Sequence, residues 1–232
     1  MDTSIYRQFA ISTLKLEFND INKLVTAFTH RSYLNEHKKL RLEHNERYEF
    51  LGDAVLELVV TEYLFNNFSE PEGILTNWRS SLVRTESIGA VADRYGFLPL
   101  MRLSKGEKRG SDRARQQILA NCYEAVIGAI YLDIGYSAAV KFISDSLIIT
   151  LDEILKSGSW VDPKSQLQEL SQSRDDATPN YRVITEEGPD HDKIFTIGVF
   201  INNVLYGQGT GPSKQIAQQK AASQAIEKYK SV

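Results

Sequence analysis

The chain has 232 residues, of which 42% are hydrophobic and 25% are charged, enough for one large or two modest globular domains. Its formal net charge of −3, from 27 basic and 30 acidic residues, gives no indication of nucleic-acid binding. The single cysteine, Cys122, excludes an internal disulfide and a multi-cysteine zinc site, and it fits a reducing, cytoplasmic location. We see no signal-peptide pattern and no stretch suited to a membrane span, so we expect no membrane association.

The first two-thirds of the chain have the apolar period of helices, because apolar residues recur every three or four positions. Polar breaks at 69–73 and 105–112 separate the runs. The pattern predicts an all-α domain over residues 1–156. A small polar segment, 157–162, is expected to link it to a second domain.

The last part, residues 163–232, has a mixed pattern that predicts a small α+β domain. The expected elements, in chain order, are a helix at 165–173, strands at 181–186, 195–201 and 204–208, and a final helix to Lys230. Asn202 and Asn203 suit the turn between the last two strands, and Pro212 suits the first position of the last helix. The predicted order is helix, three strands, helix.

An acidic row lies in the first domain. Glu46, Glu49, Asp53 and Glu57 are spaced by three, four and four residues, so they share one face of a helix. From spacing alone, a solvated acidic face is the simpler interpretation. The alternative is a site for a hard divalent cation, which takes several oxygen ligands and cancels the repulsion.

Two further features lie near this row. Gly52 within a helix costs about 1 kcal/mol relative to alanine, which suggests close approach of another group, for packing or for function. Asn121 and Glu124 are three residues apart, in a run of small apolar residues. An unpaired buried carboxylate is unfavourable, so Glu124 needs either a shared metal ion or a hydrogen-bonded structural role.

These residues resemble bacterial ribonuclease III, and the resemblance extends over nearly the whole chain. The matching motifs, in the order of that family, are AFTHRSYLNE (27–36), NERYEFLGD (45–53), Glu72-Gly73, ILANCYEAVIGAIYLD (118–133), PKSQLQELSQ (163–172), EEGPDH (186–191) and GTGPSKQIAQQKAA (209–222). The second half resembles the double-stranded RNA-binding domain of the family.

The resemblance implies a homodimeric endoribonuclease that uses Mg²⁺, with Mn²⁺ as an alternative ion and no organic cofactor. It would cut double-stranded RNA to 5′-phosphate and 3′-hydroxyl ends, in ribosomal RNA precursors and other structured RNAs. By motif, Glu49, Asp53, Asn121 and Glu124 occupy the metal-ligand positions, with Asp53 and Glu124 as the catalytic pair. Glu46 and Glu72 match acidic positions beside the metal site. Phe50 and Leu51 would supply either a dimer contact or core packing.

Asn121 departs from the family pattern, which has an aspartate there. An amide oxygen can ligate Mg²⁺ but brings no negative charge. Three hypotheses are open: an active enzyme with a natural asparagine, a catalytically weakened RNA-binding protein, or an engineered, slowed variant. Because the other carboxylates are present, we favour the first.

RNA-binding residues are expected at three places in the last domain. The first helix offers Gln168, Glu169 and Gln172 to the 2′-hydroxyls of the minor groove, and a loop offers His191. The start of the last helix offers Ser213 and Lys214 to a phosphate. Since the domain has no net charge, we expect weak binding by this domain alone.

Overall fold

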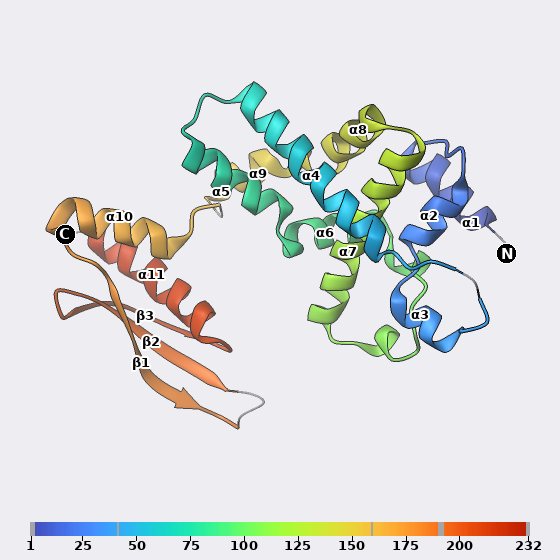
Figure 1. Ribbon diagram of the computed structural model, residues 1–232. Coiled ribbons are helices and arrows are strands. Elements are labelled where there is room, and N and C mark those ends of the chain that lie inside the picture. Colours follow the sequence, from blue (N-terminus) through green and yellow to red (C-terminus); the bar gives the residue numbers. More distant parts are fainter. Residues whose placement is uncertain (1–2, 41, 159, 190–192, 231–232) are drawn as a thin grey trace. The chain divides into compact units, whose positions relative to one another are not determined.

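The computed structural model describes residues 3–40, 42–158, 160–189 and 193–230. The chain forms two compact units, Met1–Trp160 and Val161–Val232, and the boundary lies within the range predicted to be a linker. The first unit is helical, and the second contains three strands and two helices (Figure 1). The predicted fold class, an all-α domain followed by a helix–three strands–helix domain, is therefore confirmed.

The first unit is built around two 22-residue helices, α4 and α7. Its elements are α1 (Ser4–Phe9), η1 (Ala10–Leu14), α2 (Ile21–Ala27), α3 (Arg31–Glu36), α4 (Glu46–Asn67), α5 (Glu72–Val83), α6 (Thr85–Arg94), η2 (Leu98–Leu100), η3 (Glu107–Arg109), α7 (Asp112–Asp133), α8 (Tyr136–Ser146), η4 (Ile148–Thr150) and α9 (Leu151–Ser157). The predicted break at 69–73 is shorter than expected, because α5 already begins at Glu72.

Helix α7 is the centre of this unit, with α4, α6, α2 and α8 packed against it. Most of its side chains from Ile118 to Ile130 are buried. At its C-terminal end, the Asp133 carboxylate accepts hydrogen bonds from the backbone N–H groups of Asn19 (2.6 Å) and Asp20 (3.0 Å). It also accepts one from Lys23 Nζ at 2.7 Å. These bonds join the end of α7 to the start of α2.

Helices α4 and α7 touch backbone to backbone. A Cβ atom built on Gly52 would lie 1.7 Å from the carbonyl oxygen of Glu124, and one on Gly128 would lie 2.3 Å from that of Tyr48. Real Cβ atoms never approach so closely, so only glycine fits at either position. The close approach predicted at Gly52 is confirmed, and its partner is the backbone of α7.

The second unit consists of α10 (Pro163–Asp175), β1 (Asn180–Glu187), β2 (Ile194–Ile201), β3 (Val204–Gly211) and α11 (Lys214–Lys230). The strands form an antiparallel sheet in the order β1-β2-β3. Asn202 and Asn203 have φ values of 49° and 64°, as a two-residue hairpin turn requires. The expectation that Pro212 is the first residue of the last helix is wrong, because α11 begins at Lys214. The Ser213 Oγ accepts a hydrogen bond from the Ile216 N–H at 3.3 Å, which caps the helix.

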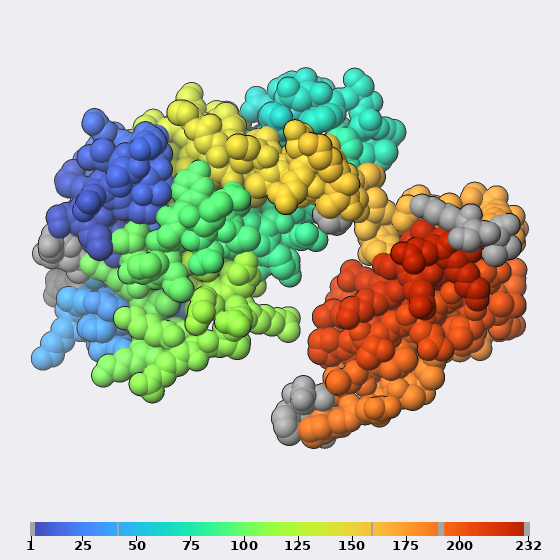
Figure 2. Space-filling view, turned by 180° about the vertical axis from the view of Figure 1, so that it is seen from behind, coloured from blue at the N-terminus to red at the C-terminus, as the bar shows by residue number. Residues whose placement is uncertain are grey.

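Helix α11 lies on the sheet and also covers the free edge of β3. Its surface, red in the space-filling view, adjoins that of the strands (Figure 2). The Gln224 Oε1 accepts a hydrogen bond from the Gln208 backbone N–H at 2.6 Å. The Lys228 Nζ donates one to the Leu205 carbonyl oxygen at 3.3 Å. Side chains of α11 therefore occupy two of the backbone groups that an edge strand leaves unpaired.

The backbone contact between α4 and α7 predicts a large effect of one methyl group. Gly52→Ala is expected to lower the free energy of unfolding by about 3 kcal/mol or more, because the helices must separate. Urea unfolding measures this change. Gly73→Ala is the matched control, since a Cβ there meets nothing within 4 Å. Equal stability of the two variants would contradict the described contact.

Candidate functional site

Four predicted site residues meet where α4 lies against α7. Glu49 and Asp53 lie on the first turns of α4, and Asn121 and Glu124 lie in the middle of α7. Because the backbone of Gly52 rests on that of Glu124, these two stretches of helix are adjacent. We call Glu49, Asp53, Asn121 and Glu124 the acidic cluster.

The electrostatics of the acidic cluster show that its carboxylates act on one another. Burial, together with the charges of Asp53 and Glu49, raises the pKa of Glu124 from its usual 4.5 to about 8. Burial and the neighbouring charge of Glu46 also raise the pKa of Glu49, whereas a hydrogen bond from Asn121 lowers it. A cation among these carboxylates would remove the repulsion between them.

The Asn121 amide is held by a second amide. The Gln117 Nε2 donates a hydrogen bond of 2.7 Å to the Asn121 Oδ1. Within the described residues, no group of three or more His, Cys, Asp or Glu side chains is arranged to hold a metal ion. The acidic cluster offers the oxygen donors that a hard divalent cation takes, and its side chains must turn to share one ion.

The remaining residues of the acidic row have partners of their own. Glu46 lies 3.7 Å from Arg31 and 3.7 Å from His44, on the helical turn before Glu49. Glu57 forms an ion pair of 3.1 Å with Arg79 of α5. Glu57 stays partly exposed, and this ion pair joins α4 to α5.

Glu72 lies away from the acidic cluster within one chain. It begins α5, just after the C-terminal end of α4. The 18 residue steps from Glu49 to Asn67 span about 27 Å of helix, at 1.5 Å per step. Within its own chain, Glu72 is therefore too far from the acidic cluster to contact an ion bound there.

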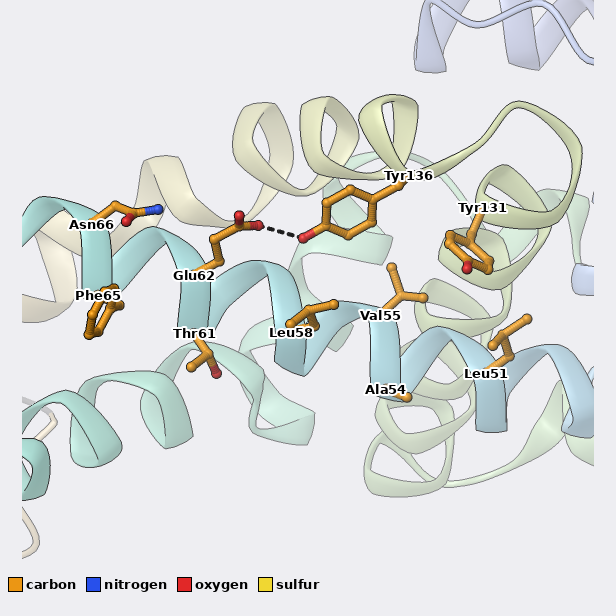
Figure 3. Close-up of a pocket in the computed structure, with 10 residues that line it drawn as sticks. All are labelled: Leu51, Ala54, Val55, Leu58, Thr61, Glu62, Phe65, Asn66, Tyr131 and Tyr136. Carbon is orange, nitrogen blue, oxygen red and sulfur yellow. Dashed lines mark hydrogen bonds between the residues drawn. The ribbon is translucent and has the colours of Figure 1, made fainter.

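An apolar groove follows α4 beside the acidic row. Phe50, Leu58 and Phe65 are 82%, 56% and 75% exposed, so Phe50 does not pack in the core of its own unit. The groove, of about 740 Å³, is lined by Leu51, Ala54, Val55, Leu58, Thr61, Glu62, Phe65, Asn66, Tyr131 and Tyr136. Figure 3 shows the lining side chains of α4 below Tyr131 of α7 and Tyr136 of α8, whose hydroxyl donates a hydrogen bond of 2.5 Å to Glu62.

In the second unit, the polar side chains predicted for RNA binding fall into two sets. Gln168, Glu169 and Gln172 are exposed and line one shallow groove on α10. Gln172 donates a hydrogen bond to Asp176. His191 lies outside the described residues.

The other set is at the start of α11. Lys214 Nζ lies 3.0 Å from the Glu186 carboxylate and 5.3 Å from the centre of the Phe195 ring. The predicted phosphate-binding cation is thus already paired with an anion of β1. Sequence reasoning missed this pair, because no local spacing relates Glu186 to Lys214.

Comparisons with known proteins agree with this architecture. Residues 20–151 match a family described as Ribonuclease-III-like, and residues 163–229 match the double-stranded RNA binding motif. The chain is 46% identical to "Ribonuclease 3" of Enterococcus faecalis over 210 residues, which cover 90% of this chain and 91% of that protein. It is 43% identical to "Ribonuclease 3" of Streptococcus pneumoniae, with 98% and 96% covered. The chain belongs to the ribonuclease III family.

A solved ribonuclease III structure supports the assignment of the first unit. The nuclease domain of the Campylobacter jejuni enzyme is 35% identical, with a TM-score of 0.53, and covers 60% of this chain and 96% of that one. Its description concerns flexibility in a region involved in dimer formation. The chain therefore combines a ribonuclease III-type endonuclease domain with a double-stranded RNA-binding domain. None of its described helices is both long and apolar enough to cross a membrane.

The raised pKa of Glu124 predicts a pH-dependent stability of the chain in EDTA. Unfolding returns this carboxyl to its usual pKa of 4.5, so between pH 4.5 and pH 8 the folded chain binds more protons than the unfolded chain. Stability contributed by this group is therefore present below pH 4.5 and lost as the pH rises to 8. Glu124→Gln should stabilise the chain by roughly 2–4 kcal/mol at pH 8 and much less at pH 5.

Urea unfolding at both pH values measures this difference. The control is Glu153→Gln on α9, which removes an exposed carboxylate that is not among the charges acting on Glu124 and should not stabilise the chain. An equal effect of Glu124→Gln at pH 5 and pH 8 would contradict the electrostatic description of the acidic cluster.

Proposed function

We propose that the chain is a Mg²⁺-dependent endoribonuclease that hydrolyses double-stranded RNA to 5′-phosphate and 3′-hydroxyl ends. The observation that carries the proposal is the acidic cluster, in which α4 and α7 bring three carboxylates and one amide together. A protein that only bound RNA would gain nothing from clustered carboxylates, because they repel phosphate. Membership of the ribonuclease III family supports the same conclusion.

The residues of the acidic cluster would hold Mg²⁺, or Mn²⁺ in its place, through carboxylate oxygens of Glu49, Asp53 and Glu124. Such an ion would supply an activated water and would stabilise negative charge on the attacked phosphate. Asp53, which is exposed, and Glu124, which is half-buried, are the proposed catalytic residues that fix the water against the phosphodiester. Glu46, one helical turn before Glu49, adds negative charge beside the site.

A homodimer is part of this proposal, with the groove on α4 as the contact surface. Phe50, Leu58 and Phe65 form an apolar stripe along the side of α4 that the core of the unit leaves exposed. Two copies of the stripe would bury each other, since a two-fold contact repeats the same surface on both partners. The description of the Campylobacter jejuni relative, which mentions dimer formation by its nuclease domain, supports a dimer without indicating the contact surface.

Structured RNAs with long duplex segments, such as ribosomal RNA precursors in the cytoplasm, are the proposed substrates. Gln168, Glu169 and Gln172 on α10 would bond to 2′-hydroxyls, and Ser213 and Lys214 at the start of α11 would contact a phosphate. His191 is kept as a proposed contact on the strength of its motif.

The primary test is cleavage of a labelled RNA duplex by the purified chain. We expect cutting with Mg²⁺, none with EDTA, and products with 5′-phosphates. Glu124→Gln should abolish cleavage, while Glu57→Gln should retain it, because Glu57 pairs with Arg79. Duplex binding without cleavage, restored by Asn121→Asp, would overturn the proposal and establish the chain as a weakened RNA binder.

The dimer is tested by light scattering after size exclusion. The wild-type chain should have twice the mass of one chain, and Phe65→Glu should convert it to monomers, because a charge in an apolar contact is strongly unfavourable. Ile149→Glu is the control, since Ile149 is also exposed (70%) but lies outside α4. A monomeric wild-type chain, or equal behaviour of both variants, would refute this contact.

The ion pair between Lys214 and Glu186 predicts opposite effects on RNA affinity in EDTA. Lys214→Ala should weaken duplex binding and reduce the slope of log K against log salt by about 1, as for one lost phosphate contact. Glu186→Gln should strengthen duplex binding, because Lys214 can then bind a phosphate without first breaking its ion pair with Glu186. Lys228→Ala removes the same charge about 21 Å further along α11 and should change neither quantity. Fluorescence anisotropy over a salt series measures all three.

A further inference from the structure

The orientation of the Asn121 amide does not suit a metal ligand. An amide accepts hydrogen bonds only on its oxygen, which has two lone pairs, and donates them only from the two N–H bonds of its NH₂ group. The oxygen of Asn121 accepts a hydrogen bond from the Gln117 Nε2 at 2.7 Å. Its NH₂ group is the donor left for Glu49, because the hydrogen bond with Asn121 lowers the pKa of Glu49, as donation to the carboxylate does. A hard cation binds oxygen ligands. In this orientation the part of Asn121 that faces Glu49 is its NH₂ group, which cannot bind a cation.

A half-turn of the Asn121 amide exchanges its oxygen and its nitrogen. Gln117 tolerates the exchange, because its own amide also carries both a donor and an acceptor. After both amides turn, the Asn121 NH₂ donates to the Gln117 Oε1, and the Asn121 oxygen faces the acidic cluster. Gln117 is exposed and lies one helical turn before Asn121 on α7, so packing does not block the motion.

We propose that Gln117 is a positioning residue that forms a two-state amide switch with Asn121. In the first state, the Asn121 NH₂ holds the Glu49 carboxylate when no cation is bound. In the second state, the Asn121 oxygen is available to a divalent cation, and the Gln117 oxygen holds the NH₂ group. The inference rests on the proposed metal-dependent function, and it concerns how this chain's own amides respond to the ion.

The switch gives the asparagine a role that an aspartate does not have. A carboxylate at position 121 would add a further negative charge beside Glu49 whether or not an ion is present. The amide instead supplies a donor to Glu49 in the empty site and an acceptor in the loaded site. Gln117 thereby sets how readily the acidic cluster takes up an ion.

The test is Mg²⁺ binding to the EDTA-treated full chain, measured by calorimetry at constant ionic strength. Gln117→Glu leaves only acceptors at position 117, so it should hold the Asn121 NH₂ and keep the Asn121 oxygen toward the ion. We expect Mg²⁺ to bind about fivefold or more tightly, the effect of one hydrogen bond. Arg113→Gln changes the net charge equally, one further turn away on α7, and should change the affinity by less than about twofold.

Position 121 provides the second arm of the test. An aspartate at position 121 carries two equivalent oxygens, so it has no second orientation. In the Asn121→Asp background, Gln117→Glu should therefore raise the Mg²⁺ affinity no more than Arg113→Gln does. Equal effects of Gln117→Glu and Arg113→Gln in the original background, or equal gains in both backgrounds, would overturn the switch. Wild-type Mg²⁺ binding that is unaffected by Glu124→Gln would instead overturn the proposed metal site itself.

Nuclear magnetic resonance of the side-chain amides gives a readout independent of affinity and of activity. The Asn121 NH₂ protons should show cross-relaxation with Glu49 in EDTA and with Gln117 in Mg²⁺. The Asn121→Asp variant identifies the resonances by their loss. An Asn121 NH₂ group that keeps the same neighbours in both conditions would overturn the switch, even if Mg²⁺ binds.

Discussion

The backbone contact between α4 and α7 is the constraint on which the site depends. Each helix supplies two of the four side chains of the acidic cluster, so the distance between the helix axes sets the distance across the cluster. Gly52 and Gly128 bring the backbones into contact, and a side chain on either would separate them. The separation is fixed by main-chain atoms, which makes it independent of side-chain rotation. Side chains that can rotate about their own bonds are therefore carried on a pair of helices whose separation is fixed.

The acidic cluster opposes folding, and the rest of the first unit compensates for it. Half-buried carboxylates close to one another are unfavourable without a counter-ion, as the raised pKa of Glu124 indicates. The stabilising contributions lie on other parts of the same helix. The side chains of α7 around Tyr123 are fully buried, and Asp133 joins its end to the start of α2. Helix α7 is thus anchored at its core and at its end while its middle carries the site.

Much of this arrangement was predictable from the sequence, but only where information is local. Periodicity predicted the helices and strands, and the glycine at position 52 predicted a close approach. That α4 meets α7 came only from the family resemblance, because spacing along one helix does not identify its neighbour. The role of Phe50 was ambiguous for a related reason. An apolar helix face that packs in the core of its own chain has the same sequence pattern as one that contacts a second chain. Gln117 was missed although a signal existed, because it stands four residues before Asn121 and shares its face.

The covered edge of β3 matters when many copies of the chain bind one long RNA. A strand edge with unpaired N–H and C=O groups is a template on which a neighbouring chain can add a strand. Gln224 and Lys228 occupy backbone groups of β3 that such joining would use. The same helix that begins with Lys214 therefore also blocks strand addition at β3, whereas β1 forms the other edge of the sheet.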